Sequence, residues 1–256
     1  MSTLANAVDV LKLIARLRRS ITVTDLVAEM AMPKSSASRT LSTMAAHGLL
    51  DRDETTRAYR PGRAIMEAAF HFRSSENTVS LLEEAVDSLV AASGYTGYIN
   101  VLDGADSLVI QMRTGAGSLQ VYTPPGTRAP AYATSIGRAI LARLTDDDAV
   151  ALLGPRLEVR RGQVPRTRKD LLARLAQVRS SGWSLSRGEY VPNVAGISAA
   201  VQDPSTRQIY GLGIALPVQD LSERLIERFS TLVVETAREV GTRVGDTYWL
   251  NLATTA

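Results

Sequence analysis

Residues 34–43 combine short hydroxyl side chains with two cations in a pattern that suits contact with a nucleic acid. If the segment is helical, Ala37, Leu41 and Met44 fall on one apolar face. Serine is a weak helix former, so three serines within four residues favour a surface that approaches phosphates and base edges. The alternative is a solvated polar face. The polar side chains are Lys34, Ser35, Ser36, Ser38, Arg39, Ser42 and Thr43.

Two short helices joined by a tight turn are expected to present this face. Thr22 and Asp25 match a capping pair at the start of the first helix, and Thr22 is also counted among the expected DNA contacts. Ala31 and Met32 form the turn. Pro33 is predicted to be the first residue of the second helix, 33–47, where its missing N–H costs nothing. Such a pair places its second helix in the major groove of DNA. For Arg39, contact with a base and contact with a phosphate both stay open.

A charged hairpin is predicted to follow this helix as a wing. Gly48 suits the left-handed position that ends a helix. Segments 49–52 and 57–60 read as two strands around the turn 53–56. Arg57 and Arg60 are expected to reach the flanking minor groove or the DNA backbone, and the alternative is that they are ordinary exposed arginines.

Composition places the chain among globular proteins of two domains. It has 256 residues, of which 45% are hydrophobic and 21% are charged. Residues 1–72 carry ten Lys and Arg against seven Asp and Glu, which accounts for the whole net charge of +3. The excess of positive charge therefore lies in the predicted DNA-binding part, as phosphate contacts require.

Several classes of protein are poorly supported by the residue types present. The chain has no cysteine, which excludes disulfides, thiolate nucleophiles and Cys-type zinc sites. Two histidines far apart in sequence do not support a multi-histidine metal site or a Ser-His-Asp triad, so we expect no metal and no cofactor. We find neither an apolar run of membrane-spanning length nor a secretory signal pattern, and we expect a cytoplasmic protein with no membrane partner.

Beyond the wing, the sequence predicts a linker and an α+β domain. Residues 63–73 form an apolar-rich helix whose surface must be buried on a partner subunit or on the chain itself. The remainder predicts one mainly antiparallel sheet flanked by helices. Helices are expected at 79–92, 135–144, 146–153, 169–181 and 222–243, and strands at 95–101, 108–113, 119–122, 197–202 and 209–216. The expected domains are 1–62 for DNA binding, 63–77 as linker and 78–256 for ligand binding and oligomerisation.

A small-molecule site is predicted beside the helix that opens near Ser135. Its free backbone N–H groups favour an anion, and Arg113 would pair with a carboxylate. Tyrosines 95, 98, 122 and 132 could line an aromatic pocket, so a small organic acid, aromatic ones included, is the expected ligand. The alternative is that the tyrosines are half-buried sheet residues and Arg113 is an edge charge. The predicted ligand-binding residues are Tyr98, Asn100, Arg113, Tyr132, Thr134, Ser135, Ile136, Ser186 and Ser198.

Short motifs along nearly the whole chain resemble the IclR family of bacterial transcriptional regulators. The resemblance rests on the order and spacing of residues 26–28, 32–39, 41–44, 47–50, 59–62, 133–142, 182–184, 188–189 and 197–201. The sequence departs from the family pattern at Arg138, which replaces the usual Lys, and at Gln202, where Pro is common. The loop 191–196 lacks the cysteine of many members.

This resemblance implies a winged helix-turn-helix, a linker helix and a C-terminal GAF-like effector domain. It also implies dimers or tetramers on near-palindromic operators. The expected function is that of an effector-responsive regulator of a catabolic operon and not that of an enzyme. Repression is the first expectation, and activation stays open.

Two other functions stay open at this point. An enzyme with an accessory helix-turn-helix would use Glu189, Asp203 and the basic loop 160–166, although the sequence offers no nucleophile–base pair. A DNA-architectural protein would bind no ligand at all.

Overall fold

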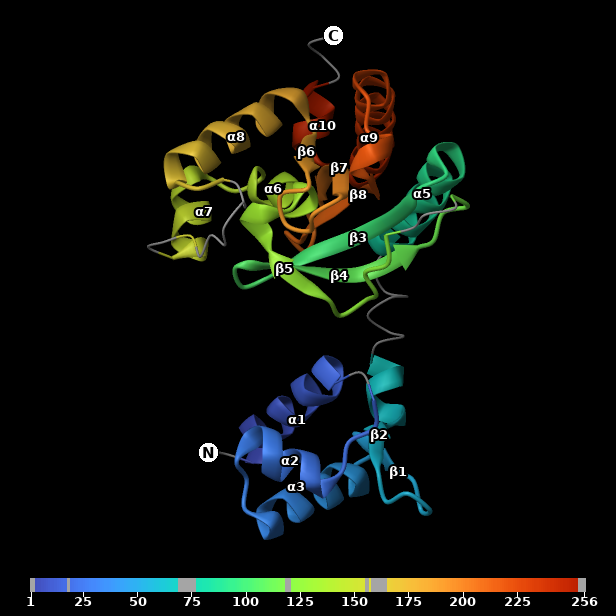
Figure 1. Cartoon of the computed structure of the whole chain (residues 1–256), viewed down its shortest axis with the longest axis vertical. Helices are drawn as coiled ribbons and strands as arrows, with labels where there is room; N and C mark the ends of the chain where they lie inside the picture. Colours follow the sequence, from blue (N-terminus) through green and yellow to red (C-terminus); the bar gives the residue numbers. More distant parts are fainter. Residues whose placement is uncertain are drawn as a thin grey trace. The chain divides into compact units, whose positions relative to one another are not determined.

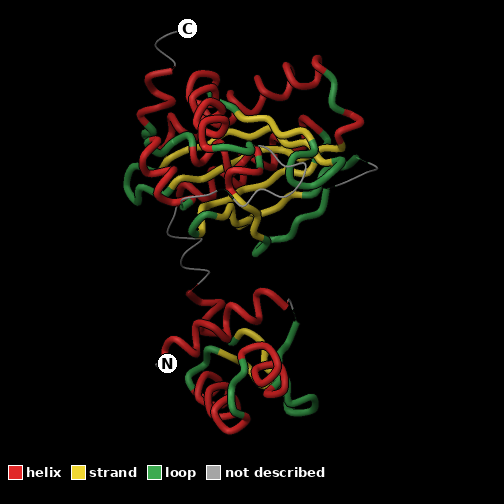
Figure 2. Tube along the Cα trace, turned by 60° about the vertical axis from the view of Figure 1, so that its left-hand side comes forward, coloured by secondary structure: helices red, strands yellow, loops and turns green. Residues whose placement is uncertain are grey.

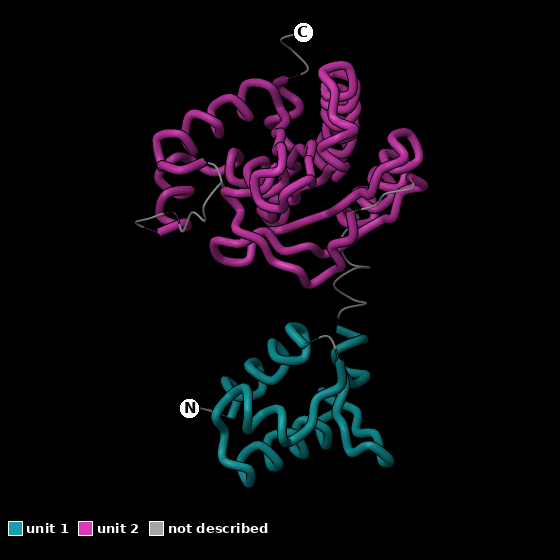
Figure 3. Tube along the Cα trace, viewed as in Figure 1, with its two compact units in different colours: residues 1–77 teal, residues 78–256 magenta. Residues whose placement is uncertain are grey.

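The computed structural model describes residues 3–17, 19–68, 77–117, 121–154, 157 and 165–252. It divides into two compact units, Met1–Asn77 and Thr78–Ala256 (Figure 3). Within the described ranges no helix is both long enough and apolar enough to cross a bilayer.

Unit 1 is a winged helix-turn-helix, as the sequence predicts. Leu13, Leu26, Leu41 and Leu50 belong to one core that joins all three helices to the hairpin. An isolated bridge between Ile21 and Tyr59 also ties the segment before the second helix to the hairpin. The elements are α1 (Thr3–Leu17), α2 (Val23–Met30), α3 (Lys34–Ala46), β1 (Leu50–Arg52) and β2 (Tyr59–Pro61) (Figure 1).

The ends of α3 follow local backbone chemistry. Pro33 has φ −57° and ψ 138°, so it precedes the helix instead of being its first residue, which corrects the prediction by one position. Gly48 has φ +72° and ends the helix as predicted. Its N–H bonds to the carbonyl of Ala45 at 3.0 Å, and the N–H of Leu49 bonds to the carbonyl of Met44 at 2.9 Å. Residues 63–68 are helical, whereas the rest of the predicted linker helix, 69–73, lies outside the described residues.

Unit 2 contains one six-stranded antiparallel sheet with strand order β5-β4-β3-β8-β7-β6. Figure 2 shows these strands side by side in yellow across the unit. The strands are β3 (Thr96–Asp103), β4 (Asp106–Arg113), β5 (Arg128–Pro130), β6 (Ser184–Arg187), β7 (Val194–Gln202) and β8 (Ile209–Pro217). The helices are α5 (Asn77–Ser93), α6 (Ser135–Leu141), α7 (Asp146–Leu153), α8 (Arg168–Ser181), α9 (Glu223–Val244) and α10 (Thr247–Leu252), with 3₁₀ turns η1 (Ala131–Ala133) and η2 (Val218–Asp220).

The two faces of the sheet carry different residues because side chains alternate along each strand. Ile197, Ala199 and Val201 of β7 belong to the core formed with α5, α9 and α10. Ala200 belongs instead to a small cluster with Ile140 of α6. A third cluster packs η1 and α6 against α7 and α8. The helix α6 therefore lies on the face opposite α9.

Most predicted elements of unit 2 are present, and the differences concern short or edge segments. The strand predicted at 119–122 falls partly on residues that are not described, and residues 121–122 are not a strand. The edge strand is β5 instead. The sequence analysis missed β6 and α10, which are only four and six residues long.

A β-bulge in β4 changes which way its last residues face. Ile99 pairs with Gln111 whereas its neighbour Asn100 pairs with Val109, so Ile110 is the extra residue. Ile110 packs against the α5/α9 core, and the Gln111 side chain donates to Glu83 of α5 at 2.6 Å. Two consecutive side chains thus face α5, and the alternation of the strand is inverted beyond the bulge.

Candidate nucleic-acid interface and ligand pocket

The polar face of α3 is open to solvent. The helix buries Ala37, Thr40, Leu41 and Met44. All seven predicted polar residues of this helix are exposed. Their side chains make no hydrogen bond or ion pair within the described part of the chain. These seven side chains are therefore free to bind a partner.

Thr22 differs from these residues because its hydroxyl caps α2. Its Oγ1 accepts from the Asp25 N–H at 3.4 Å and donates to the Asp25 carboxylate at 2.9 Å, while the Thr22 N–H also donates to that carboxylate at 2.7 Å. Arg19 donates twice to Asp25, at 3.0 and 2.6 Å. The Arg19 hydrogen bonds are the largest cause that holds the pKa of Asp25 well below its ordinary value. The structure thus gives the Thr22 hydroxyl a role in capping α2, and its contact with DNA stays a prediction.

The wing exposes both arginines predicted to contact DNA. Asp53 organises the turn, since its Oδ1 accepts from the N–H groups of Thr55 at 2.9 Å and Thr56 at 2.7 Å. Arg57 follows in the left-handed conformation with φ +60°. Arg60 lies 3.9 Å from the Asp51 carboxylate, and both side chains are more than half exposed. Salt bridges this exposed contribute little to stability, so the Arg60 guanidinium can readily exchange its partner.

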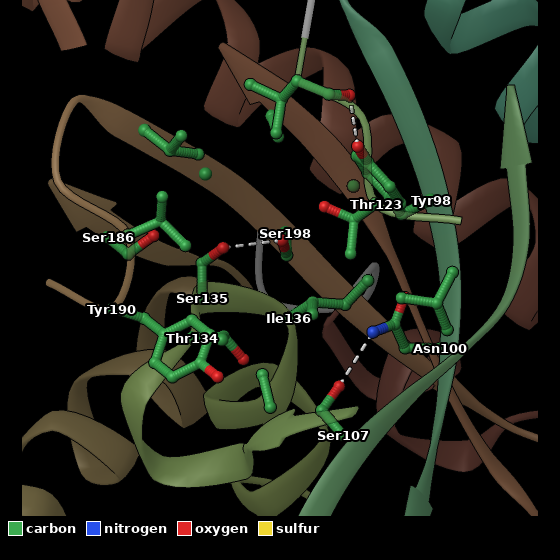
Figure 4. Close-up of a pocket in the computed structure, with 18 of the residues that line it drawn as sticks. Tyr98, Asn100, Ser107, Thr123, Thr134, Ser135, Ile136, Ser186, Tyr190 and Ser198 are labelled. Atoms are coloured by element: carbon green, nitrogen blue, oxygen red, sulfur yellow. Dashed lines mark hydrogen bonds between the residues drawn. The ribbon is translucent and has the colours of Figure 1, made fainter. Parts of the chain in front are cut away.

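In unit 2, a cavity of about 240 Å³ lies between the start of α6 and the sheet (Figure 4). All six strands of the sheet contribute to its wall, and so do residues of the segments 121–127 and 190–191. Seven of the nine residues predicted to bind a ligand line it: Tyr98, Asn100, Thr134, Ser135, Ile136, Ser186 and Ser198.

Hydrogen bonds fix the polar groups of this cavity. The hydroxyls of Ser135 and Ser198 are 3.0 Å apart and both buried. Thr134 caps α6, because its Oγ1 accepts from the Gly137 N–H at 3.1 Å. The Tyr98 hydroxyl donates to the Val121 carbonyl at 2.5 Å, and burial raises the pKa of this phenol. The Tyr98 side chain is thus held in one position as part of the cavity wall.

Glycines let α6 approach the sheet closely while leaving space beside it. A Cβ at Gly211 would lie 2.6 Å from Ile136, and a Cβ at Gly196 would lie 2.4 Å from the Ser135 hydroxyl. On this face Gly213 and Ser198 are neighbours across β7 and β8. Because these residues have small side chains or none, little of the space between the sheet and the start of α6 is filled. The cavity is the part of this space that no side chain occupies.

The structure corrects the prediction for Arg113. Its guanidinium pairs with Asp87 at 2.7 Å and with Glu83 at 3.8 Å, and it does not line the cavity. Uninterrupted alternation in β4 would have pointed Arg113 to the same side as Val109, which does line the cavity. The bulge at Ile110 turns Arg113 to the α5 side instead.

The other tyrosines of the predicted aromatic pocket also lie elsewhere, apart from Tyr98. Tyr132 is buried in the cluster that η1 forms with α6, α7 and α8, and it does not line the cavity. Tyr95 packs edge-on against Phe229 at 5.7 Å. Tyr122 is 72% exposed. Of the four, only Tyr98 is therefore part of the cavity wall.

Sequence reasoning missed five lining residues with polar side chains: Ser107, Thr123, Thr127, Arg128 and Tyr190. Arg128 is the one charged side chain among the described lining residues, and it pairs with Asp103 at 2.6 Å. Its place became visible only with the edge strand β5, which the prediction put elsewhere. Tyr190 lies in the turn after β6, a strand that was not predicted.

The carboxylates that the sequence offered for an enzyme have structural partners. Glu189 pairs with Arg138 at 2.6 Å and with Arg174 at 3.1 Å. Asp203 accepts from the hydroxyls of Thr78 at 2.7 Å and Ser205 at 2.6 Å. Most of the basic loop 160–166 lies outside the described residues. Among the residues that are described, no group of three His, Asp or Glu side chains could hold a metal ion.

Both units match family models of one kind. Residues 71–242 match "Bacterial transcriptional regulator IclR C-terminal", and residues 3–54 match "IclR helix-turn-helix domain". Among curated proteins, HTH-type transcriptional regulator BhcR of Paracoccus denitrificans (strain Pd 1222) is 27% identical over 238 residues, which are 93% of this chain and 85% of that protein. Transcriptional repressor IclR of Escherichia coli (strain K12) is 23% identical over 248 residues, 94% of this chain and 89% of that protein.

Solved structures share the fold. The structure of an IclR homolog from Microbacterium hydrocarbonoxydans complexed with 4-hydroxybenzoate superposes with a TM-score of 0.78. It is 21% identical to this chain, and the match covers 93% of this chain and 99% of that one.

Proposed function

Because this chain belongs to the IclR family of bacterial transcriptional regulators, we propose that the exposed face of α3 and the wing bind operator DNA while the cavity of unit 2 binds the effector. The chain is a transcriptional regulator with a helix-turn-helix domain and an effector-binding C-terminal domain. In this proposal residues 1–62 contact DNA, residues 63–77 link and residues 78–256 sense the effector and hold the oligomer together.

One observation carries the assignment of the DNA contacts. The serines and the two cations of α3 face solvent without partners among the described residues, whereas the apolar residues of the same helix are buried. In a helix-turn-helix the second helix enters the major groove, where short hydroxyls allow close approach to the duplex. Ser35, Ser36, Ser38 and Arg39 would then face base edges and phosphates, with Lys34, Ser42, Thr43, Arg57 and Arg60 as further contacts.

The proposed regulation is repression that a small organic acid relieves. The Escherichia coli relative is named a repressor, and the Microbacterium homolog is described with bound 4-hydroxybenzoate. The effector would shift the population between a form that fits the operator and one that does not. A difference in affinity of about 1–3 kcal/mol between the forms changes operator occupancy about 5- to 150-fold.

We also propose that the protein acts as a symmetric oligomer in the cytoplasm and catalyses no reaction. Leu4, Val8 and Met66, all in unit 1, are exposed at 74%, 43% and 69%, and a second copy would cover this apolar surface in addition to contacts through residues 78–256. Two copies related by a two-fold axis present two recognition helices to the halves of a near-palindromic operator. Light scattering of the full chain, with and without a duplex, measures whether a dimer or a tetramer binds.

Substitution of Arg39 tests the DNA interface. The operator is first selected from a random duplex library with the full-length protein, and affinity is then measured across a range of salt concentrations. Arg39→Ala should weaken operator binding by about 1–3 kcal/mol if Arg39 reads a base, and relax specificity at one position. If it contacts a phosphate, affinity falls for all sequences and the salt dependence decreases by about one unit.

Arg224→Ala is the matched control, because Arg224 is an exposed arginine in unit 2. It should leave operator affinity unchanged. Equal affinities for wild type and a Lys34→Ala/Arg39→Ala double variant would show that α3 is not the DNA-binding helix.

A further inference from the structure

Asn100 is a buried amide whose hydrogen-bonding capacity is not filled by the protein. The residue is 4% exposed, and its Nδ2 donates to the Ser107 hydroxyl at 2.9 Å. Its Oδ1 has no partner. Four buried side-chain atoms of the described residues lack a partner, and Asn100 Oδ1 is the one that belongs to a residue lining the cavity. Buried polar atoms are nearly always paired in folded proteins, so this one points to a partner that enters the cavity.

Three other hydroxyls of the cavity are engaged within the protein. Ser135 and Ser198 bond to each other, and the Tyr98 hydroxyl bonds to a backbone carbonyl. Figure 4 shows the Asn100–Ser107 bond at the side of β3 and β4, well apart from the Ser135–Ser198 bond. The cavity therefore has a separate polar end whose amide is only half satisfied.

The wall around these polar groups is largely apolar. Val109, Ile136 and Val194 contribute aliphatic side chains from three different elements. No carboxylate lines the cavity among the described residues, and the single cation, Arg128, already pairs with Asp103. A ligand that fits this wall has a compact, mostly apolar body.

We propose that the effector carries a hydroxyl or N–H group that bonds to Asn100, and that the Asn100–Ser107 pair makes the cavity select for this group. The inference rests on the proposed role of the cavity as the effector site. A hydroxyl both donates and accepts, so it can bond to the Asn100 amide whether the amide oxygen or the amide nitrogen faces the ligand. An analogue without that group leaves the buried amide unpaired, which is the condition under which binding sites discriminate most strongly.

Matched pairs of small compounds test the selection. The full-length protein is titrated by calorimetry with pairs that differ in one hydroxyl, beginning with benzoate and its 2-, 3- and 4-hydroxy derivatives and extending to aliphatic acids and alcohols. One hydroxylated member of a pair should bind at least tenfold more tightly than its partner. The crystal structure of that complex should place its hydroxyl within hydrogen-bonding distance of Asn100.

Asn100→Leu provides the decisive comparison. Leucine is close to asparagine in size and has no polar atom, so the variant should lose the preference for the hydroxylated member and bind the other member equally well or better. Ser88→Ala removes an exposed hydroxyl of α5 that does not line the cavity, and it should keep the preference. If Asn100→Leu does not fold, Ser107→Ala serves instead, because it releases the amide from its one partner and should reduce the preference while Asn100 stays in place.

The outcomes separate this inference from the proposed function. If both members of every pair bind equally, or if Asn100→Leu keeps the preference, the inference is wrong while the cavity remains the effector site. A complex in which a water molecule, and not the ligand, bonds to the Asn100 amide would also contradict the inference. If no compound of the panel binds, or if binding lies outside the cavity, the proposed effector site itself is contradicted and the inference fails with it.

Discussion

Two arginines hold a left-handed backbone conformation that glycine normally adopts. Arg57 in the wing and Arg207 in the β7–β8 turn both have φ +60°. Their turns are alike, because Asp53 bonds through its N–H to the Ala58 carbonyl at 2.8 Å and Asp203 bonds to the Gln208 carbonyl at 2.9 Å. A residue other than glycine costs about 1–2 kcal/mol in this conformation. At Arg57 the proposed contact of the side chain with DNA would offset this cost.

Replacing each arginine by glycine separates stability from DNA binding. Arg57→Gly and Arg207→Gly should each relieve backbone strain, for a gain of about 1 kcal/mol that is reduced by the greater freedom of glycine in the unfolded chain. Arg57→Gly alone should weaken operator binding and lower its salt dependence. Hydrogen exchange of each turn and operator titration measure the two effects. If Arg207→Gly weakens binding as much as Arg57→Gly, the effect does not arise at the wing.

At the scale of the element, the start of α2 depends on one carboxylate. Asp25 closes the capping box with Thr22, and the Arg19 hydrogen bonds hold the pKa of Asp25 below its ordinary value of 3.8. Because the pKa in the folded state is the lower one, this stabilisation is complete at neutral pH, above the ordinary value, and is lost as the pH falls below it.

Asp25→Ala should therefore destabilise α2 by about 1 kcal/mol at neutral pH, and the difference from wild type should shrink as the pH falls below about 4. Hydrogen exchange of the backbone amides of α2, followed from pH 7 to pH 3 on the full chain, measures this. A difference that is constant over this range would mean that the carboxylate charge does not matter.

Helix α6 depends on a buried ion pair. Arg138 is 1% exposed and donates to Glu189 at 2.6 Å and to the carbonyl of Leu185 at 2.6 Å. Burial lowers the pKa of Arg138, and Glu189 opposes that effect. Removing one partner of a buried pair leaves an uncompensated charge.

Arg138→Met should destabilise unit 2 by about 3 kcal/mol. Arg128→Met is the matched control, because Arg128 pairs with Asp103 at the same 2.6 Å but both side chains are about half exposed. It should cost less than about 1 kcal/mol. Both tryptophans, Trp183 and Trp249, lie in unit 2, so their fluorescence during denaturation reports on this unit. Equal losses for the two variants would contradict a special role for the buried pair.

The sequence predicts the longer elements well and the facing of individual side chains less well. Helices α7, α8 and α9 are present close to their predicted bounds, and the structure shows that Thr145, Thr167 and Ser222 cap their starts. The direction of Arg113 could not be predicted, since a single extra residue at Ile110 inverts the strand and no local pattern announces such a bulge. The cavity itself depends on glycines that meet α6 from distant strands, which is a tertiary property.

At the scale of the whole molecule, the proposed coupling between cavity and operator must be reciprocal. If a ligand found with the compound panel lowers operator affinity by some factor, the operator must lower the affinity for that ligand by the same factor. Calorimetric titration of the ligand into the free protein and into its operator complex measures both quantities. A factor of one in both titrations would show that the cavity and the operator are not coupled.

The glycines under α6 have a consequence for how long the protein survives in a cell. A space left between a helix and a sheet lowers the stability of a domain, and a molecule that fills it restores that stability. Proteases degrade chains that open, so a regulator with an empty cavity should be cleared faster than an occupied one. The supply of the metabolite would then set the amount of the regulator as well as its activity, and pulse-chase labelling with and without the compound would reveal it.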